Sequence, residues 1–197
     1  MRELRVVTGR VAVLDRADVD TDQIIPKQFL KRIERTGYGE FLFFDWMKDP
    51  AFELHRAENA GASILFSGRN FGCGSSREHA AWALDDYGFR VVIAPSFGDI
   101  FRRNAINTGL APIMLGPARH AELQRALEER NELTVDLERL AIEHPSGLSV
   151  PFEFDEHDRE TLLYGLDDIA RTLAQAERID AYEETMSPRF DALALPT

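Results

Sequence analysis

The chain has 197 residues, which is enough for one domain of medium size or for one domain with a tail. Hydrophobic residues make up 44% and charged residues 29%, a composition that excludes wholesale disorder. The formal net charge is -11, because 34 acidic residues outnumber 23 lysines and arginines. A chain this acidic is a poor general ligand for nucleic acid or for an anionic membrane, so local positive features must hold any anionic substrate.

Cysteine usage and hydropathy indicate in which kind of cellular compartment the protein works. Cys73 is the single cysteine, which excludes an internal disulfide and a metal site built from several thiolates of this chain. The sequence starts with an alternating pattern and shows neither a secretory signal nor an apolar run of transmembrane length. These features fit a reducing compartment, and we expect a cytoplasmic protein.

The first third of the chain mixes strand, polar and aromatic segments. Residues 4–14 predict one or two short strands with a break at Gly9. A polar stretch follows at 15–22, residues 28–34 predict one or two helical turns, and an aromatic cluster occupies 41–46.

The middle of the chain alternates between short apolar runs and helical patterns. This β-α-β-α-β order predicts a parallel sheet with right-handed crossovers. The expected strands are 62–66, 90–94 and 112–115, and the expected helices are 76–86 and 97–107, the second capped by Ser96.

The last third predicts a surface helix at 118–130 and strands within 133–154 joined by turns at Gly147 and Pro151. We therefore expect an α/β domain over residues 1–154. A helical C-terminal extension over 155–197 would pack on that domain or on a partner. Its possible apolar stripe is Leu162, Leu163, Leu166, Ile169 and Leu173.

Residues 68–80 carry the strongest chemical signal, because this loop follows a predicted strand and opens a predicted helix. A helix N-terminus presents unpaired N–H groups and about half a positive charge, so it attracts anions. Arg77 in the first turn is unusual, since that turn prefers acidic residues. An anion in front of the helix that accepts a bidentate pair from Arg77 explains its presence.

Three common interpretations of such a loop fail. The dinucleotide-binding fingerprint needs glycine where Arg77 stands, the phosphate-binding loop needs Gly-Lys-Ser/Thr, and the hydrolase elbow needs Gly-x-Ser-x-Gly. A capping box, with Ser75 as cap and Glu78 reaching back, is the structural alternative. The two functions are compatible, because Glu78 can cap while a hydroxyl faces a ligand.

Two segments in this order carry a family resemblance. Residues 70–80 (NFGCGSSREHA) resemble the signature of the swivelling domain in the aconitase superfamily, and residues 20–26 (DTDQIIP) resemble its other signature. With residues 43–46 (FFDW) and 163–169 (LYGLDDI), the sequence is most similar to the family of bacterial 3-isopropylmalate dehydratase small subunits. The resemblance covers nearly the whole chain.

The resemblance implies a swivelling β/β/α domain with a mixed sheet. It also implies a hydro-lyase that interconverts 2- and 3-isopropylmalate through isopropylmaleate in leucine biosynthesis. In the family, a separate large subunit carries a [4Fe-4S] cluster on three cysteines and the two chains form a heterodimer. The lone Cys73 agrees with a chain that holds no cluster itself.

Residue roles follow from the same resemblance. Ser75 matches the serine that takes the proton from carbon as its alkoxide. Ser76 and Arg77 match contacts of the substrate carboxylate, and Arg77 is also a catalytic residue that stabilises the Ser75 alkoxide. Gly74 belongs with them in the substrate-binding loop. Asp22 matches an aspartate that orients charged partners at the site; a turn or cap before Ile24 is its structural alternative.

The segment after Pro26 sets substrate specificity in the family. Phe29, Leu30 and Ile33 suit an apolar isopropyl group. Lys31 and Arg32 stand nearby, so a substrate with a further acid group stays open. Leu30 and Lys31 are therefore candidate substrate-binding residues, and core packing at helical spacing is the alternative for Phe29 and Ile33.

Other residues rank lower. His79 lies one helical turn from Ser75, and we expect a structural role for it. Cys73 occupies a position where aconitase has an acidic residue, so no catalytic role is assigned to it. The aromatic cluster at 41–46 suits either a contact for the large subunit or core packing.

Other functions stay open from sequence. A sister enzyme acting on homoaconitate, citraconate or methylmalate is an alternative within the class. A stand-alone anion-binding regulatory module is an alternative from another class. Such a module would bind dicarboxylates tightly by itself, whereas half a site binds weakly.

Overall fold

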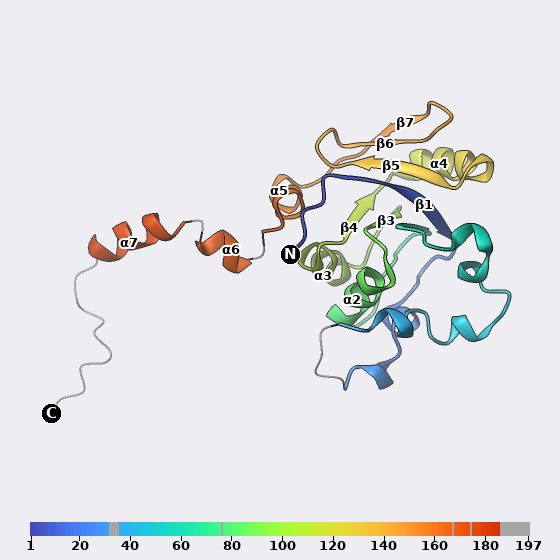
Figure 1. Cartoon of the computed structure of the whole chain (residues 1–197), viewed down its shortest axis with the longest axis horizontal. Coiled ribbons are helices and arrows are strands. Elements are labelled where there is room, and N and C mark those ends of the chain that lie inside the picture. The colour runs from blue at the N-terminus through green and yellow to red at the C-terminus, as the bar shows by residue number, and fades with distance from the viewer. Residues whose placement is uncertain (32–35, 76, 167, 174, 186–197) are drawn as a thin grey trace. The chain divides into compact units, whose positions relative to one another are not determined.

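The computed structural model describes residues 1–31, 36–75, 77–166, 168–173 and 175–185 (Figure 1). The chain divides into two compact units, Met1–Gly165 and Leu166–Thr197. The seven-stranded sheet lies within the first unit. The second unit contributes the helices α6 (Asp168–Leu173) and α7 (Ala176–Thr185).

The first unit is built on a mixed sheet with the strand order β4-β3-β2-β1-β5-β6-β7 (Figure 1). The parallel half consists of β1 (Val6–Leu14), β2 (Ile64–Ser67), β3 (Val91–Ala94) and β4 (Ala111–Met114). The antiparallel half extends from β1 through β5 (Glu132–Asp136), β6 (Ala141–Glu143) and β7 (Ser149–Pro151). The predicted α/β fold with a mixed sheet is confirmed.

The predicted β-α-β-α-β unit is also confirmed. Every residue of β2 and β3 is buried, as the continuous apolar runs of central parallel strands require. Residues 6–14 form one strand without a break at Gly9. A Cβ at that glycine would lie 2.1 Å from Ser63 Oγ, so any larger residue there would force the Ser63 side chain to shift.

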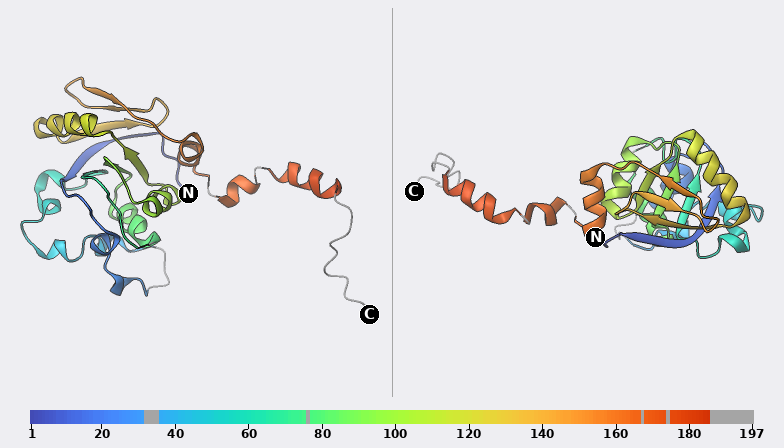
Figure 2. Two further views of the ribbon diagram at one scale, coloured as in Figure 1. Left: turned by 180° about the vertical axis from the view of Figure 1, so that it is seen from behind. Right: turned by 90° about the horizontal axis from the view of Figure 1, so that it is seen from above.

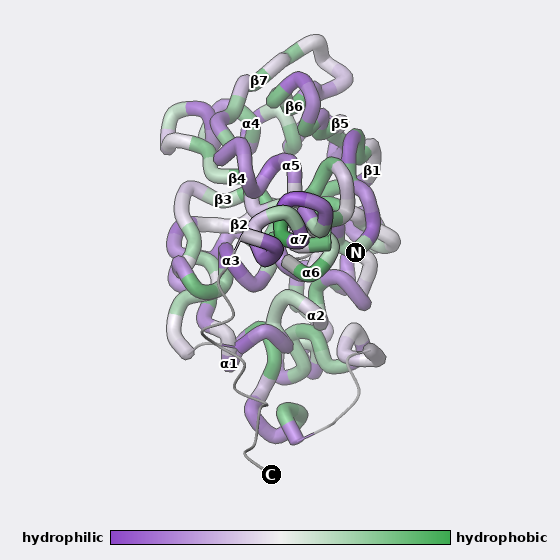
Figure 3. The backbone as a smooth tube through the Cα atoms, turned by 90° about the vertical axis from the view of Figure 1, so that its left-hand side faces the viewer, coloured by the Kyte–Doolittle hydropathy of each residue, from purple (hydrophilic) through white to green (hydrophobic). Residues whose placement is uncertain are grey.

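Helices cover both faces of the sheet (Figure 2). One core lies between the sheet and α2 (Glu78–Tyr87), α3 (Asp99–Thr108) and the segment from α1 (Thr21–Ile24) through several 3-10 turns to β2. The other core lies under α4 (Pro117–Glu129) and α5 (Glu156–Tyr164). Hydrophobic and hydrophilic stretches are interspersed along the backbone (Figure 3).

Several predicted boundaries shift. The helix α2 begins at Glu78 rather than at 76, and α3 begins at Asp99 with Gly98 as its N-cap. Ser96 does not cap α3, because its hydroxyl accepts a hydrogen bond from the N–H of Asn70 at 2.9 Å. The turn predicted at Pro151 is wrong: this residue ends β7, an edge strand that tolerates proline.

The predicted C-terminal apolar stripe is interrupted. Leu162 and Leu163 are buried in the core of the first unit, and α5 ends at Tyr164 with Gly165 as a left-handed C-cap. In the second unit, Ile169 and Leu173 are exposed.

The aromatic cluster at 41–46 is split between core and surface. Phe43 is fully buried, with its ring stacked on Trp46 at 5.3 Å and in edge contact with Phe52. Phe41 and Phe44 are half-buried and contact Phe29. Core packing therefore accounts for Phe43, and the partner contact stays a prediction for the others.

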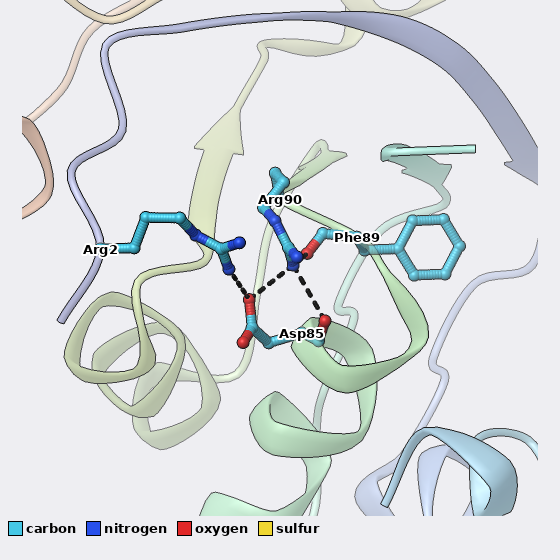
Figure 4. Close-up of polar contacts among 4 residues, drawn as sticks. All are labelled: Arg2, Asp85, Phe89 and Arg90. Carbon is cyan, nitrogen blue, oxygen red and sulfur yellow. Dashed lines mark hydrogen bonds and ion pairs between the residues drawn. The ribbon is translucent and has the colours of Figure 1, made fainter. Parts of the chain in front are cut away.

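An ionic cluster ties the N-terminal segment to the end of α2 (Figure 4). The Asp85 carboxylate accepts from Arg90 Nη1 at 2.6 Å and from Arg2 Nη2 at 3.1 Å. The same Arg90 nitrogen donates to the backbone carbonyls of Asp85 and Phe89. Arg90 thus satisfies carbonyls at the C-terminus of the helix, where a cation is favoured.

His120 is a buried histidine beneath the sheet. Its ring stacks on Phe66 at 4.1 Å, and Nε2 lies 2.9 Å from the Ser67 carbonyl oxygen. Burial lowers the pKa of His120 from the ordinary 6.5, although the Ser67 carbonyl and Asp15 oppose that shift. The folded protein therefore holds this ring neutral at neutral pH.

We expect His120 to make the fold sensitive to acid. Because its pKa is lower in the folded state, the unfolded chain binds more protons below pH 6.5, and stability is lost as the pH falls through this range. In denaturant titrations between pH 7 and pH 5, His120→Gln should flatten the decline by up to about 1.4 kcal/mol per pH unit. An unchanged slope in the variant would show that other groups cause the acid sensitivity.

Candidate functional site

The predicted site residues gather where the parallel strands end. β1 and β2 run parallel, with Leu14 paired to Ser67, and β2 and β3 run parallel in turn. The loops that follow these three strands therefore leave the same edge of the sheet. In α/β sheets this edge is the usual place for a ligand site.

The loop after β2 pairs with the loop after β1. The Gly72 N–H donates to the Val19 carbonyl at 2.7 Å, and the Thr21 N–H donates to the Cys73 carbonyl at 3.0 Å. Further back, the Asp18 carboxylate accepts from Arg69 and from the Asn70 side chain. Backbone hydrogen bonds thus join the segments of the two sequence signatures.

The other side of the same loop pairs with the loop after β3. The Phe71 N–H donates to the Ser96 carbonyl at 3.1 Å, and the Gly98 N–H donates to the Phe71 carbonyl at 2.9 Å. The loop after β2 is therefore held by backbone hydrogen bonds to a neighbouring loop on each side.

Arg77 and Asp22 form a bidentate ion pair across the two signatures. Both guanidinium Nη atoms donate to the carboxylate, Nη2 at 2.9 Å to Oδ2. The Arg77 side chain is 13% exposed, whereas Asp22 is 54% exposed. The hydrogen bonds from Arg77 hold the pKa of Asp22 below its usual value, with a smaller contribution from Lys27. The pair is therefore ionised at neutral pH.

Ser75 lies exposed at the end of the same loop. It follows Gly74, which has a left-handed backbone (φ +91°), and its carbonyl accepts a hydrogen bond from the Thr21 hydroxyl at 3.0 Å. Ser76, predicted to contact the substrate carboxylate, lies outside the described residues. The structure thus brings Asp22, Gly74, Ser75 and Arg77 to one surface.

The start of α2 differs from the predicted one. Arg77 is the N-cap, with extended backbone, rather than a residue of the first turn, and no side chain caps the helix. The capping box expected for Ser75 and Glu78 is therefore absent at this end. Backbone hydrogen bonds hold the loop through Cys73, Gly74 is left-handed, and helical geometry begins only after Arg77.

The cap that was the structural alternative for Asp22 is made instead by Asp20, two residues earlier. Asp20 is the N-cap of α1, where its side chain accepts from the Gln23 N–H at 2.8 Å and Gln23 returns a bond to the Asp20 N–H. This capping box frees the Asp22 carboxylate for Arg77.

The predicted specificity residues lie on the next turn of the chain. Leu30 is half-buried against the core, and Lys31 is exposed. In the described part of the chain, neither Leu30 nor Lys31 forms a hydrogen bond or ion pair with Asp22, Ser75 or Arg77. Arg32 and Ile33 lie outside the described residues.

His79 and Cys73 take no part in the charged cluster. The His79 ring is in edge contact with Tyr38 at 5.1 Å and lies 4.7 Å from Trp82, and burial lowers its pKa. The expected packing role of His79 agrees with these contacts. Cys73 is half-buried beside Asp20, and burial raises the pKa of its thiol.

Sequence reasoning missed two residues of this site. Thr21 binds the loop of Ser75, and Lys27 adds positive charge beside Asp22. The capping pattern of residues 20–23 was the available signal, since it places Thr21 and Asp22 together on one short helix.

The described part of the chain carries neither a metal-binding cluster nor a helix that could span a membrane. Within it, no group of three or more His, Cys, Asp or Glu side chains is arranged to hold a metal ion. Over the same residues, no helix combines the length and hydropathy needed to span a bilayer.

Known proteins share both the sequence and the fold. The Aconitase C-terminal domain family matches residues 1–118. The small subunit of 3-isopropylmalate dehydratase from Rhodopirellula baltica is 55% identical over 93% of this chain and 98% of its own. The Bacillus subtilis protein of the same name is 51% identical over 98% of this chain and 100% of its own.

A solved structure gives the same result in three dimensions. The 3-isopropylmalate dehydratase chain of Methanocaldococcus jannaschii superposes with a TM-score of 0.67 at 30% identity, covering 88% of this chain and 99% of its own. The predicted swivelling domain of the aconitase type is thereby confirmed. The chain belongs to the 3-isopropylmalate dehydratase small-subunit family of the aconitase superfamily.

Proposed function

We propose that this chain is the small subunit of a 3-isopropylmalate dehydratase, a hydro-lyase of leucine biosynthesis. It would interconvert 2- and 3-isopropylmalate through isopropylmaleate. The observation that carries the proposal is the match to subunits of that name over nearly the whole chain, together with the cluster of Asp22, Ser75 and Arg77 at the sheet edge.

Ser75 would be the base of this reaction. Its oxygen, as an alkoxide, takes the proton from the carbon next to the departing hydroxyl, and the electron pair of that C–H bond forms the double bond. A serine alone is a weak base, so its surroundings must stabilise the alkoxide. Arg77 and the unpaired N–H groups at the start of α2 supply positive potential there.

Arg77 would bind a substrate carboxylate through its planar fork. The Asp22 pair supports this role because it fixes the guanidinium before substrate arrives and compensates part of its charge. We also propose Ser76, Gly74, Leu30 and Lys31 as substrate contacts, with Leu30 offering the apolar surface that suits an isopropyl group.

The rest of the site would lie on a partner. We propose a heterodimer with a large subunit, in the cytoplasm. That subunit would hold a [4Fe-4S] cluster, which supplies a Lewis acid for the departing hydroxyl. This chain, with one cysteine, suits the cluster-free half of the site.

Reconstitution tests the proposal. We expect no isopropylmalate dehydration from this chain alone, and activity when it is mixed anaerobically with a cluster-loaded large subunit. Calorimetry of the isolated chain with dicarboxylates should show weak binding, because half of the site is missing. If the mixture is inactive on isopropylmalate but dehydrates homoaconitate or methylmalate, that compound would replace isopropylmalate as the proposed substrate. Tight dicarboxylate binding by the isolated chain would favour a regulatory module instead.

A further inference from the structure

We propose that the Thr21 hydroxyl is a positioning group that sets the place of Ser75. This inference rests on the proposed function, because it gives Thr21 a task only if Ser75 is the base.

Thr21 forms two hydrogen bonds with the loop that carries Ser75. Its N–H donates to the Cys73 carbonyl at 3.0 Å, and its hydroxyl donates to the Ser75 carbonyl at 3.0 Å. The two acceptors flank Gly74. Thr21 is 2% exposed, so its hydroxyl is directed into the protein rather than toward solvent.

The flexibility of Gly74 explains why Ser75 needs the hydrogen bond from Thr21. Gly74 adopts φ +91°, a conformation that glycine reaches freely and other residues rarely adopt. A glycine before Ser75 leaves the position of Ser75 free unless the chain after it is also held. The Thr21 hydroxyl supplies that hold, since it donates to the Ser75 carbonyl, which belongs to the peptide on the C-terminal side of Ser75.

The support for Thr21 is itself rigid. Thr21 is the first residue of α1, whose start is closed by the capping box of Asp20 and Gln23. Its carbonyl accepts from the N–H of Ile25, and Ile24 and Ile25 are fully buried. The helix α1 is therefore fixed by the core, and it keeps the Thr21 hydroxyl in one position.

The same short helix also orients Arg77. Asp22, the residue after Thr21, makes the bidentate pair with that guanidinium. One turn of helix thus fixes both the base and the carboxylate-binding group, through adjacent residues. This arrangement holds the distance between the two groups constant, as a reaction that depends on orientation requires.

Loss of this hydroxyl should disturb catalysis more than folding. Ser75 is exposed and its bond with the Thr21 hydroxyl is only partly buried, which limits the cost in stability when the donor is removed. Water does not fix the direction of the peptide, and the hydroxyl of Ser75 would then sample positions away from the substrate carbon.

The test compares Thr21→Ser with Thr21→Ala, two variants that differ by one oxygen, and adds Thr21→Val to keep the branched shape. Each full-length chain is assembled with the cluster-loaded large subunit. Thr21→Ala and Thr21→Val should lower kcat about tenfold with KM within about twofold, and Thr21→Ser should stay within about twofold of wild type. The primary isotope effect with 3-isopropylmalate deuterated at the carbon that loses its proton should rise in the two slow variants.

Three outcomes would overturn the inference. One is an unchanged kcat in Thr21→Val. Another is a loss in Thr21→Ser as large as in Thr21→Ala. The third is a kcat loss with an unchanged isotope effect and a lowered melting temperature, which indicates a structural role alone. Ser75→Ala, measured in parallel, separates failure of this inference from failure of the proposed function. Full activity in Ser75→Ala would show that Ser75 is not the base, whatever the Thr21 variants do.

Discussion

Replacing Ser75 by alanine should abolish most of the dehydration activity of the assembled enzyme. Removing a positioned base typically costs between a hundredfold and ten-thousandfold, and we expect kcat to fall by about a thousandfold. KM should change little, because the substrate carboxylates are bound by other groups. The rate is followed by the absorbance of the double bond in isopropylmaleate.

Ser149→Ala is the matched control for this variant. Ser149 is also an exposed serine, but it lies on the edge strand β7, away from the loops that follow β1 and β2. It should retain full activity. A Ser75→Ala enzyme that works within a few-fold of wild type would show that another group takes the proton.

Arg77→Lys should lower kcat/KM by about a hundredfold, although it keeps the positive charge. A lysine cannot make the planar two-point contact that Arg77 makes with Asp22, and would make with a substrate carboxylate. Because the Arg77 side chain is only 13% exposed, water cannot fully replace the lost contacts. The measurement is steady-state kinetics of the assembled enzyme with 3-isopropylmalate.

Arg139→Lys serves as the control for this change of side chain. Arg139 lies in the turn between β5 and β6, is 66% exposed and pairs with Glu143 of β6. Its replacement should therefore leave kinetics and stability unchanged. Equal kinetics in Arg77→Lys and wild type would contradict the carboxylate-binding role.

The strands and the order of the elements were predictable because their signal is local. β2 and β3 are continuous apolar runs bounded by polar residues and glycine, and burial on both faces is the reason for that pattern. The uninterrupted β1 was missed because Gly9 looks like a break in sequence. In the structure Gly9 pairs with Leu133 of β5 and packs beside Ser63, residues that are distant in the sequence.

The site was predictable only in part, because its contacts join distant segments. The resemblance to two family signatures pointed to Asp22, Ser75 and Arg77, and the Asp22–Arg77 ion pair between segments 55 residues apart brings two of them into direct contact. The start of α2 was not predictable, because Ser75-x-x-Glu78 fits a capping box locally. Backbone pairing with the loops after β1 and β3 outweighs that local preference.

Thr21 shows the limit most clearly. The capping pattern of residues 20–23 places Thr21 on a short helix beside Asp22, but it does not indicate what the Thr21 hydroxyl binds, because that partner lies 54 residues ahead in the chain. Only the folded backbone shows that it reaches the Ser75 carbonyl.

A structure of the assembled enzyme with bound 3-isopropylmalate tests the assignment of the base most directly. The quantity to measure is the distance from Ser75 Oγ to the substrate carbon that loses its proton. The account predicts about 3 to 3.5 Å, with Arg77 on a substrate carboxylate. A Ser75 hydroxyl turned away from that carbon, with another side chain in its place, would contradict it.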